Sequence, residues 1–399
     1  GPWTAAQLMA ATTKAHLQFA ERIESFVRDI IVPYETDSRR TSHGPDEALI
    51  QELRAKAREA GLFNPHIAVD GVPLEHREIA PILRASGLSP LGPLALNTAA
   101  PDEGNIHLLS KVATPSQRER FLHPLLAGKR SAFLMSEPAA ENGAGSDPAM
   151  LMTTAHQDGK IWVVNGRKAF ITGFAGAEIA ILMARTDRGD GQVAATMFLV
   201  SLPNPAIRID RVPSTIDSSM PGGHSTLTIT DLRLSDEDIL GGAHEGFAYA
   251  QVRLAPARLT HCMRWLGAAT RAQEIAAHYA IKRMAFGKPL IDHEAVGFML
   301  ADNRIALKQS ELMIDWCAAL LDAGEKGTTE SSMAKVAISE ALFKVADNCV
   351  QIMGGTGVSS DTVVEQIFRE IRAFRIYDGP TEVHKWSIAK QIKREGSDS

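Results

Sequence analysis

Apolar positions near the N-terminus recur at helical spacing, and prolines and glycines interrupt them. The pattern predicts a helix over residues 5–32, ended by a proline, and a charged amphipathic helix over 47–60, stopped by a glycine. Residues 71–101 are rich in glycine and proline and predict loops, and a helical pattern resumes over 116–126. The first part of the chain is therefore expected to be helical.

The middle of the chain changes to short apolar runs separated by Asn, Gly, Pro and Asp. One run leads into Asn165-Gly166, the strongest short signal for a β-hairpin turn. Apolar runs at 179–183 and 197–200, and alternating apolar positions over 227–234, predict strands. Residues 131–240 are therefore expected to form a β domain.

The last part of the chain carries two long apolar stripes. Their members are Leu300, Leu307, Ile314 and Leu321, and then Ile338, Leu342, Val345, Cys349 and Ile352. Such spacings put apolar side chains on one face, as packed bundle helices require. The predicted fold is α+β, with an N-terminal helical domain (3–130), a central β domain (131–240) and a C-terminal four-helix bundle (241–395).

Composition narrows the class of protein. Apolar residues make up 45% of 399, charged residues 22%, and the formal net charge of −5 argues against a nucleic-acid partner. Three scattered cysteines exclude a disulfide framework and fit a reducing compartment. No apolar run reaches the ~18 residues of a membrane span. Gly1-Pro2 resembles a tag-cleavage remnant, and no signal pattern follows it. We expect a soluble, intracellular protein with no integral membrane segment, placed in the cytoplasm if bacterial or in an organelle matrix if eukaryotic.

The sequence contains none of the common catalytic motifs considered next. Gly143-Ala144-Gly145 lacks the third glycine of a dinucleotide-binding turn, and the Gly-Lys pairs lack the upstream glycine of a P-loop. GxSxG and HExxH patterns are absent. The 13 histidines are therefore interpreted as surface or hydrogen-bonded core residues. Triphosphate chemistry, zinc hydrolysis and serine hydrolysis are disfavoured, and no metal site is expected.

Four stretches in order resemble the acyl-CoA dehydrogenase family of flavoenzymes. They are residues 135–138 (MSEP) with 143–147 (GAGSD), 165–172 (NGRKAFIT), 283–290 (RMAFGKPL), and 351–357 (QIMGGTG) with 375–382 (RIYDGPTE). The first three are similar to the family's TEP-GAGSD, NGxKxWIT and RxxFGKxL motifs. The late motif Asp378-Gly379-Pro380-Thr381-Glu382-Val383-His384 is most similar to a branch that reads DGPxEVH. The resemblance implies an acyl-CoA dehydrogenase-like fold with FAD as the cofactor.

The resemblance also assigns residues to the flavin. The backbone of Met135 and the side chain of Ser136 would meet the edge of the flavin ring. Phe170 and Thr172 would flank the N5 side, with Phe170 where the family usually has Trp. Phenylalanine keeps an apolar wall beside the ring but lacks the indole N–H. Taken without the family, the 165–172 block is typical of a plain hairpin with a packed aromatic.

A second group of residues is implied to reach the FAD of a neighbouring subunit. Arg283 would hold flavin phosphate, because a planar guanidinium suits a pyrophosphate, and Phe286 would lie at the adenosine side. Gln351, Gly354 and Gly355 would line the same site, and they are also typical of a helix C-cap. The protein is therefore expected to be a homodimer or homotetramer.

Asp378 is implied to be the chemical centre. The reaction needs a base for the α-proton of an acyl-CoA thioester, while the β-hydrogen leaves as hydride to flavin N5. Most of the family has Glu here and the resembled branch has Asp; without the family, Asp378 is typical of a turn or helix N-cap. Ser146, Arg258 and Gly379 would contact the acyl-CoA, although residues 139–142 are extra relative to the family pattern before Ser146.

The leading hypothesis is an FAD-dependent acyl-CoA dehydrogenase that passes electrons to an electron-transfer flavoprotein. One alternative is a flavin oxidase of the same fold that uses O₂, since nitroalkane oxidases resemble this family and use an Asp base. The other is a non-catalytic flavin or acyl-CoA binding protein. The sequence leaves the length, branching and hydroxylation of the acyl group open.

Overall fold

The computed structural model describes residues 4–138 and 150–397, and the chain folds as two compact units. One unit comprises Gly1–Ser38, Ala48–Thr98 and Ala255–Ser399, and the other comprises Arg39–Glu47 and Ala99–Leu254. Each unit is built from segments that lie far apart in the sequence. The division into three consecutive domains stays a prediction.

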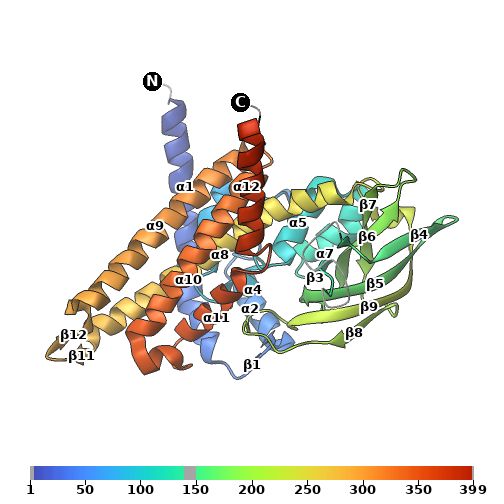
Figure 1. The fold of residues 1–399 in the computed structure, drawn as a ribbon. Helices are drawn as coiled ribbons and strands as arrows, with labels where there is room; N and C mark the ends of the chain where they lie inside the picture. The colour runs from blue at the N-terminus through green and yellow to red at the C-terminus, as the bar shows by residue number, and fades with distance from the viewer. Residues whose placement is uncertain (1–3, 139–149, 398–399) are drawn as a thin grey trace. The chain divides into compact units, whose positions relative to one another are not determined.

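The first unit is helical (Figure 1). Its helices are α1 (Ala5–Phe26), α2 (Glu47–Glu59), α3 (His76–Ser86), α4 (Gly92–Leu96), α8 (Gly246–Lys282, in this unit from Ala255), α9 (Glu294–Asp322), α10 (Thr328–Val358), α11 (Val364–Phe374) and α12 (Thr381–Ser397). A wide π-helical turn η1 (Val27–Ile31) and a tight 3₁₀ turn η2 (Val32–Thr36) follow α1. The elements β11 (Met284–Ala285), β12 (Lys288–Pro289) and η7 (Leu290–Asp292) join α8 to α9. Among the described residues, no helix is long and apolar enough to cross a membrane.

The two predicted apolar stripes are confirmed as core. Leu300 and Leu307 of α9 pack in one buried cluster with Ile338 and Leu342 of α10. Gly354 breaks the α10 helix with φ 57° and ψ −135°, so the helix resumes after the glycine pair that was expected to end it.

One prediction about the N-terminal segment is wrong. Residues 71–101 were expected to be loops, yet they contain α3 and α4. Ile82 and Leu83 of α3 are fully buried, and the stabilisation from their burial outweighs the cost of Pro81 inside the helix. The segment predicted to be a helix over 5–32 is helical throughout: α1 runs to Phe26, and the wider turn η1 and the tighter turn η2 continue it.

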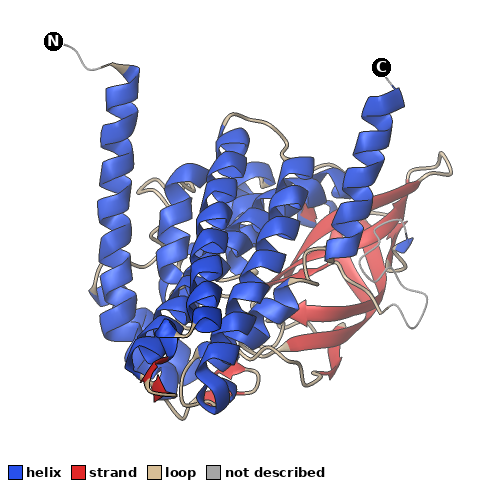
Figure 2. Ribbon diagram, turned by 60° about the vertical axis from the view of Figure 1, so that its left-hand side comes forward, coloured by secondary structure: helices blue, strands red, loops and turns tan. Residues whose placement is uncertain are grey.

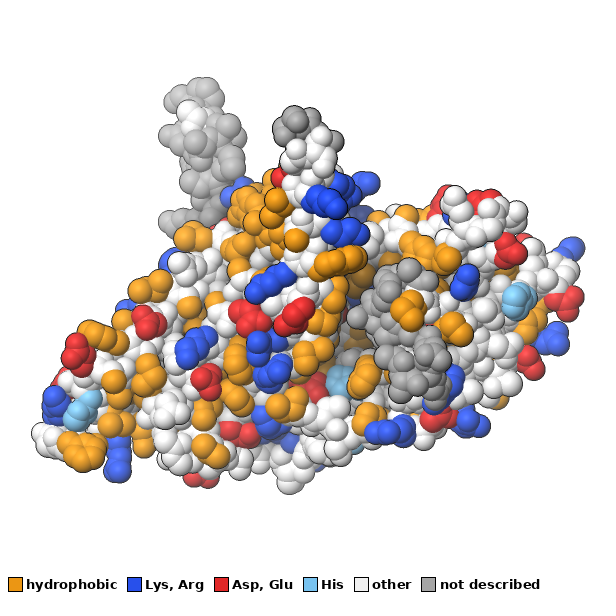
Figure 3. Space-filling view, in the orientation of Figure 1, with side chains coloured by type: hydrophobic (Ala, Val, Ile, Leu, Met, Phe, Trp, Pro, Cys, Tyr) orange, Lys and Arg blue, Asp and Glu red, His pale blue; other side chains and the backbone are white. Residues whose placement is uncertain are grey.

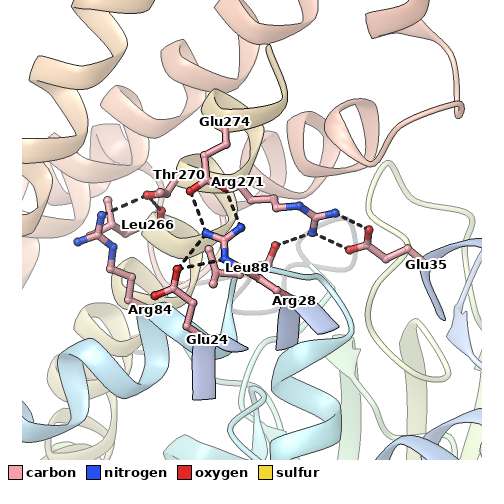
Figure 4. A network of polar contacts seen from close by, with 9 residues as sticks. All are labelled: Glu24, Arg28, Glu35, Arg84, Leu88, Leu266, Thr270, Arg271 and Glu274. Atoms are coloured by element: carbon pink, nitrogen blue, oxygen red, sulfur yellow. Dashed lines mark hydrogen bonds and ion pairs between the residues drawn. The ribbon is translucent and has the colours of Figure 1, made fainter. Parts of the chain in front are cut away.

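Ion pairs tie the chain around α1 to α8 (Figure 4). The Arg28 guanidinium donates to both Glu274 carboxylate oxygens at 2.9 Å and to Glu24 at 3.1 Å. Arg271 donates to the two Glu35 oxygens at 3.0 and 2.8 Å. Because the bonding is bidentate, each pair fixes the relative orientation of the two side chains in addition to their charge attraction.

The second unit is built on one twisted sheet, shown as red ribbons in Figure 2. Its described strands run in the order β10 (Ile239–Leu240), β7 (Val193–Ser201), β6 (Ile179–Asp187), β4 (Thr154–Asp158), β5 (Ile161–Thr172), β9 (His224–Ser235) and β8 (Ile207–Arg211). Strand β3 (Ser131–Leu134) pairs with β6 in parallel. The remaining elements are β1 (Arg40–Thr41), β2 (Gly44–Pro45), α5 (Asp102–Val112), α6 (Pro115–Gln117), η3 (Arg118–Leu122), α7 (His123–Leu126) and η6 (Asp236–Asp238).

The hairpin turn predicted at Asn165-Gly166 is also wrong, because both residues lie inside the long strand β5. The Asn165 side chain bonds across the sheet to Asp231: its amide donates to the carboxylate, and its carbonyl accepts from the Asp231 amide at 2.8 Å. A Cβ at Gly166 would collide with Thr153 of the neighbouring segment. The glycine therefore serves close backbone approach at a bulge rather than a turn.

Helices α3 and α8 touch through two glycines. A Cβ on Gly87, just after α3, would overlap the Arg264 carbonyl oxygen, and a Cβ on Gly267 would overlap that of Arg84. The two backbones therefore approach at a distance that only glycine allows.

We expect Gly267→Ala to lower the free energy of unfolding by about 3 kcal/mol, because the methyl group must displace backbone rather than a flexible side chain. Gly396→Ala is the control, since a Cβ there meets nothing within 4 Å. Urea unfolding followed by circular dichroism measures both variants. Equal stability of the two would contradict the close packing of α3 on α8.

Candidate active site

A buried lysine fixes the segment that follows β3. The Lys168 side chain is 0% exposed, and its Nζ donates to the Met135 carbonyl oxygen and to Glu137 Oε2, each at 3.0 Å. Glu137 also accepts from the backbone amides of Met152 at 2.7 Å and Thr153 at 3.0 Å. The carboxylate thus holds together two stretches of chain that lie 15 residues apart.

Burial sets the electrostatics of this pair. Desolvation lowers the pKa of Lys168 to about 8, although the Glu137 charge works in the opposite direction. Burial also tends to raise the pKa of Glu137, but the Lys168 charge and the hydrogen bonds it accepts lower the pKa overall. Both groups are therefore predominantly charged at neutral pH, and each depends on the other for compensation.

Phe170 presents an exposed aromatic ring beside this segment of β5. Its φ is +55°, in the left-handed region, and its side chain is 69% exposed. The pairing of β5 with β9 shifts register between Lys168 and Ile171, so Phe170 lies in a bulge. Left-handed backbone costs about 1–3 kcal/mol at a non-glycine residue, and such strain gathers at functional sites. A presented aromatic wall is what a flat, largely apolar ring system such as a flavin requires.

Thr172, at the end of β5, belongs to a line of hydrogen-bonded side chains. Its Oγ1 lies 2.8 Å from His224 Nδ1, and His224 Nε2 lies 2.7 Å from Asp217 Oδ2. Thr215 donates its hydroxyl to Asp217 Oδ1 at 2.6 Å. Asp217 is 6% exposed, so the line runs from the interior of the sheet unit to Thr172.

In the helical unit, Asp378 lies on the short turn between α11 and α12. Its φ is +56°, and that of Gly379 is +97°. Lys335 Nζ donates to the Gly379 carbonyl oxygen at 2.6 Å, and His384 Nε2 donates to the Asp378 carbonyl oxygen at 2.9 Å. A Cβ at Gly379 would collide with the His384 ring. Two buried side chains therefore fix the backbone that carries the Asp378 carboxylate.

The Asp378 carboxylate faces a buried histidine. His261 Nε2 lies 3.2 Å from Asp378 Oδ2, and His261 Nδ1 lies 3.1 Å from Arg264 Nη2. Arg264 also donates to the Thr98 carbonyl oxygen at 3.0 Å. A guanidinium can only donate, so His261 Nδ1 accepts and the proton of the neutral ring lies on Nε2, toward Asp378.

Burial shifts the pKa of the groups around Asp378. Desolvation lowers the pKa of Lys335 to about 8, while the Asp378 charge acts to raise it. Desolvation and the Arg258 charge lower the pKa of His384 to about 4, so this ring is neutral near pH 7. Burial also lowers the pKa of Arg258, against the attraction of Asp378. Asp378, Gly379 and Arg258 are thus gathered in one cluster with His261, Lys335 and His384, which were not assigned a role from the sequence.

The remaining sequence-predicted residues lie elsewhere. Phe286, at the tip of the β11–β12 hairpin, is 96% exposed with φ +52°. Arg283 is exposed at the end of α8, and Gln351, Gly354 and Gly355 are exposed along α10. The structure does not join these residues to the Asp378 cluster. Ser146 lies outside the described residues.

Sequence reasoning missed several residues of these clusters. Lys168, Glu137 and His384 lie inside the quoted motifs, which was the available signal, but no pattern marks His224 or Asp217. His261 and His384 do satisfy their ring nitrogens in the core, as expected of most histidines, and they also contact the Asp378 turn.

Comparison with known proteins defines the class. Residues 132–231 match the family model of the acyl-CoA dehydrogenase middle domain, and residues 244–393 match that of the acyl-CoA dehydrogenase C-terminal domain. A solved structure, the "putative acyl-CoA dehydrogenase from Mycobacterium abscessus", superposes with a TM-score of 0.86 at 32% identity, over 96% of this chain and 98% of that chain. The α+β, acyl-CoA dehydrogenase-like fold is confirmed.

Two relatives extend the likeness along the chain. The probable acyl-CoA dehydrogenase FadE2 of Mycobacterium tuberculosis is 35% identical, over 97% of this chain and 98% of the relative. Human acyl-CoA dehydrogenase family member 11 is 32% identical over 98% of this chain, which spans 52% of that longer protein. The chain therefore belongs to the acyl-CoA dehydrogenase family. It is an oxidoreductase of that type, and its cofactor is FAD.

We expect Lys168→Met to lower the free energy of unfolding by about 3–5 kcal/mol, because it leaves the Glu137 charge buried without its cation. The double variant Lys168→Met/Glu137→Gln should lose less, since it removes both charges. Lys308→Met is the control: its pair with Glu311 is solvent-exposed, and its loss should cost about 0–1 kcal/mol. Urea unfolding measures all three. A Lys168→Met variant as stable as the control would refute the anchoring role.

Proposed function

We propose that the protein catalyses the α,β-dehydrogenation of an acyl-CoA thioester to the trans-2-enoyl-CoA, with Asp378 as the base that takes the α-proton. The single observation that carries this proposal is the Asp378 turn. A carboxylate on left-handed backbone is held by two buried donors to its main chain, and His261 lies 3.2 Å from its Oδ2. A base that is fixed in this way can meet a proton at a defined position, which is what general-base catalysis needs.

The sheet unit supplies the residues we assign to the flavin ring. Met135 would use its backbone and Ser136 its side chain, in the segment that Lys168 anchors. Phe170 would supply the wall and Thr172 a hydroxyl at the N5 side. When bound, FAD accepts the electrons that leave the substrate. The left-handed, exposed Phe170 supports this fit, since nothing in a plain strand requires such a residue.

The helical unit supplies the residues we assign to the acyl-CoA. Arg258 and Gly379 belong to the Asp378 cluster, and Arg258 Nε has no hydrogen-bond partner among the described residues. A half-buried guanidinium whose buried Nε is a spare donor suits an electron-rich substrate group. Ser146 remains our proposal for a CoA contact. We assign an electron-transfer flavoprotein as the acceptor that reoxidises the enzyme.

We also propose that the protein is a homodimer or homotetramer, in which Arg283, Phe286, Gln351, Gly354 and Gly355 contact the FAD of a neighbouring subunit. Hydrophobic side chains are spread over the exposed surface of the helical unit (Figure 3). On α9 an exposed stripe comprises Phe298, Ile305, Leu312 and Trp316, with 61, 57, 60 and 42% exposure. Large apolar residues that follow one face of a helix in this way mark an interface with another chain.

We expect Asp378→Asn to retain FAD and to lower the rate of flavin reduction by acyl-CoA at least about 10³-fold, roughly 4 kcal/mol in barrier terms, because the amide keeps the size but not the basicity. Asp378→Glu should keep part of the activity. Anaerobic stopped-flow mixing with a panel of acyl-CoAs, followed by flavin bleaching, measures the rate.

The matched control for Asp378→Asn is Asp190→Asn, on an exposed turn, which should reduce its flavin at the wild-type rate. A rate for Asp378→Asn within about tenfold of wild type would assign the base to another residue. Reoxidation of the reduced enzyme by O₂ at turnover speed would make the protein an oxidase instead.

We expect Leu312→Glu to shift the protein toward smaller species and to lower the FAD content together with it, because a charge in the α9 stripe opposes burial against another chain. Ile209→Glu on β8 is the control, since Ile209 is an exposed apolar residue outside the stripe. Light scattering after gel filtration measures mass, and absorbance measures bound FAD. A monomeric wild-type protein with a full complement of FAD would contradict the shared site.

A further inference from the structure

Of the hydrogen-bonded line Thr172–His224–Asp217–Thr215, only Thr172 belongs to a quoted motif. Thr172 and His224 are directly paired across β5 and β9, so the strand register itself brings the hydroxyl to the ring. Both Asp217 and the His224 ring are largely buried, with side-chain exposures of 6 and 14%. The three contacts are 2.8, 2.7 and 2.6 Å long, which are good hydrogen-bond distances.

The chemistry of the groups fixes the direction of these bonds. Burial acts to raise the pKa of Asp217, but the hydrogen bonds from His224 and Thr215 outweigh it and lower the pKa, so the carboxylate is ionised and only accepts. The 2.7 Å contact therefore requires a proton on His224 Nε2. In the neutral ring Nδ1 then has no proton, and it accepts the hydroxyl hydrogen of Thr172.

The direction of the Thr172–His224 hydrogen bond decides what the Thr172 hydroxyl can offer to a ligand. Its hydroxyl has one hydrogen and two lone pairs. With the hydrogen committed to His224 Nδ1, the hydroxyl can offer only lone pairs to a ligand.

We propose that Asp217 and His224 are positioning residues that hold the Thr172 hydroxyl as a hydrogen-bond acceptor toward the flavin. The inference rests on the proposed function, which places Thr172 beside the N5 edge. An acceptor at that edge favours the reduced flavin, which carries an N–H there, over the oxidised flavin, which does not. The line thus tunes the balance between the two forms rather than holding the cofactor in place.

The reduction potential of the bound FAD tests this role directly. We expect His224→Phe to lower the preference for reduced over oxidised FAD about tenfold, which is about 30 mV for a two-electron couple, because the freed hydroxyl can turn its hydrogen toward the oxidised flavin. Asp217→Asn should lower the potential as well: with its Oδ1 still accepting from Thr215, its NH2 group donates to His224 Nε2, so the ring proton moves to Nδ1 and Thr172 becomes a donor. This second variant keeps the ring and the volume of the core if His224→Phe folds poorly.

A double-mutant cycle separates positioning from general damage. In a Thr172→Val background, His224→Phe should leave the potential unchanged, because the hydroxyl it acts through is gone. Thermal unfolding and FAD content of each variant report the fold. An unchanged or higher potential in both His224→Phe and Asp217→Asn overturns the proposal, and so does an equal shift of potential in the Thr172→Val background.

The Thr172→Val variant alone distinguishes the two levels of argument. If it changes neither the potential nor the flavin absorption spectrum, Thr172 does not meet the flavin, and the assignment made under the proposed function fails at this residue together with the positioning role. If it changes them while His224→Phe and Asp217→Asn do not, only the positioning role fails. The Asp378→Asn experiment is independent of both results.

Discussion

Left-handed backbone at non-glycine residues is the constraint on which the candidate site depends. Phe170, Phe286 and Asp378, which three different motifs assign to cofactor or chemistry, have φ of 55, 52 and 56°. Such a conformation costs about 1–3 kcal/mol and persists only where the surroundings determine it from several sides. In each case the strained residue presents a ring or a carboxylate away from a regular element. At these three residues, the strained backbone aims a side chain outward rather than packing it.

Two buried lysines fix main-chain segments near two of these residues, Phe170 and Asp378. Lys168 donates to the Met135 carbonyl oxygen in the sheet unit, and Lys335 donates to the Gly379 carbonyl oxygen in the helical unit. Desolvation lowers the pKa of each to about 8, which shows how costly a buried ammonium is. A lysine can span from a rigid helix or strand to a loop, and its charge strengthens the hydrogen bond to a main-chain carbonyl. The same device therefore fixes two loops that have no sequence in common.

Periodicity predicted the elements whose burial follows one face, such as the α9 and α10 stripes and the alternation along β9. Prediction from local sequence failed where the same residue types serve two different structural roles. Asn165-Gly166 is a turn signal, but here the asparagine side chain hydrogen-bonds across the sheet, and the glycine leaves room for Thr153 to approach the strand closely. Motif resemblance assigned Asp378 and Phe170, whereas His224 escaped, because its role arises from cross-strand register, which no local pattern encodes.

The choice of aspartate at residue 378 is linked to its backbone. Aspartate tolerates the left-handed region better than most residues, because its short polar side chain can bond locally. Lys335 and His384 hold both carbonyl oxygens of the turn, so the backbone cannot relax to suit a longer side chain. A carboxylate one methylene shorter reaches about 1 Å less, and for the base that we propose, about 1 Å is enough to cost a large factor in rate. Side-chain length and turn conformation therefore form one adaptation, and neither can change without the other.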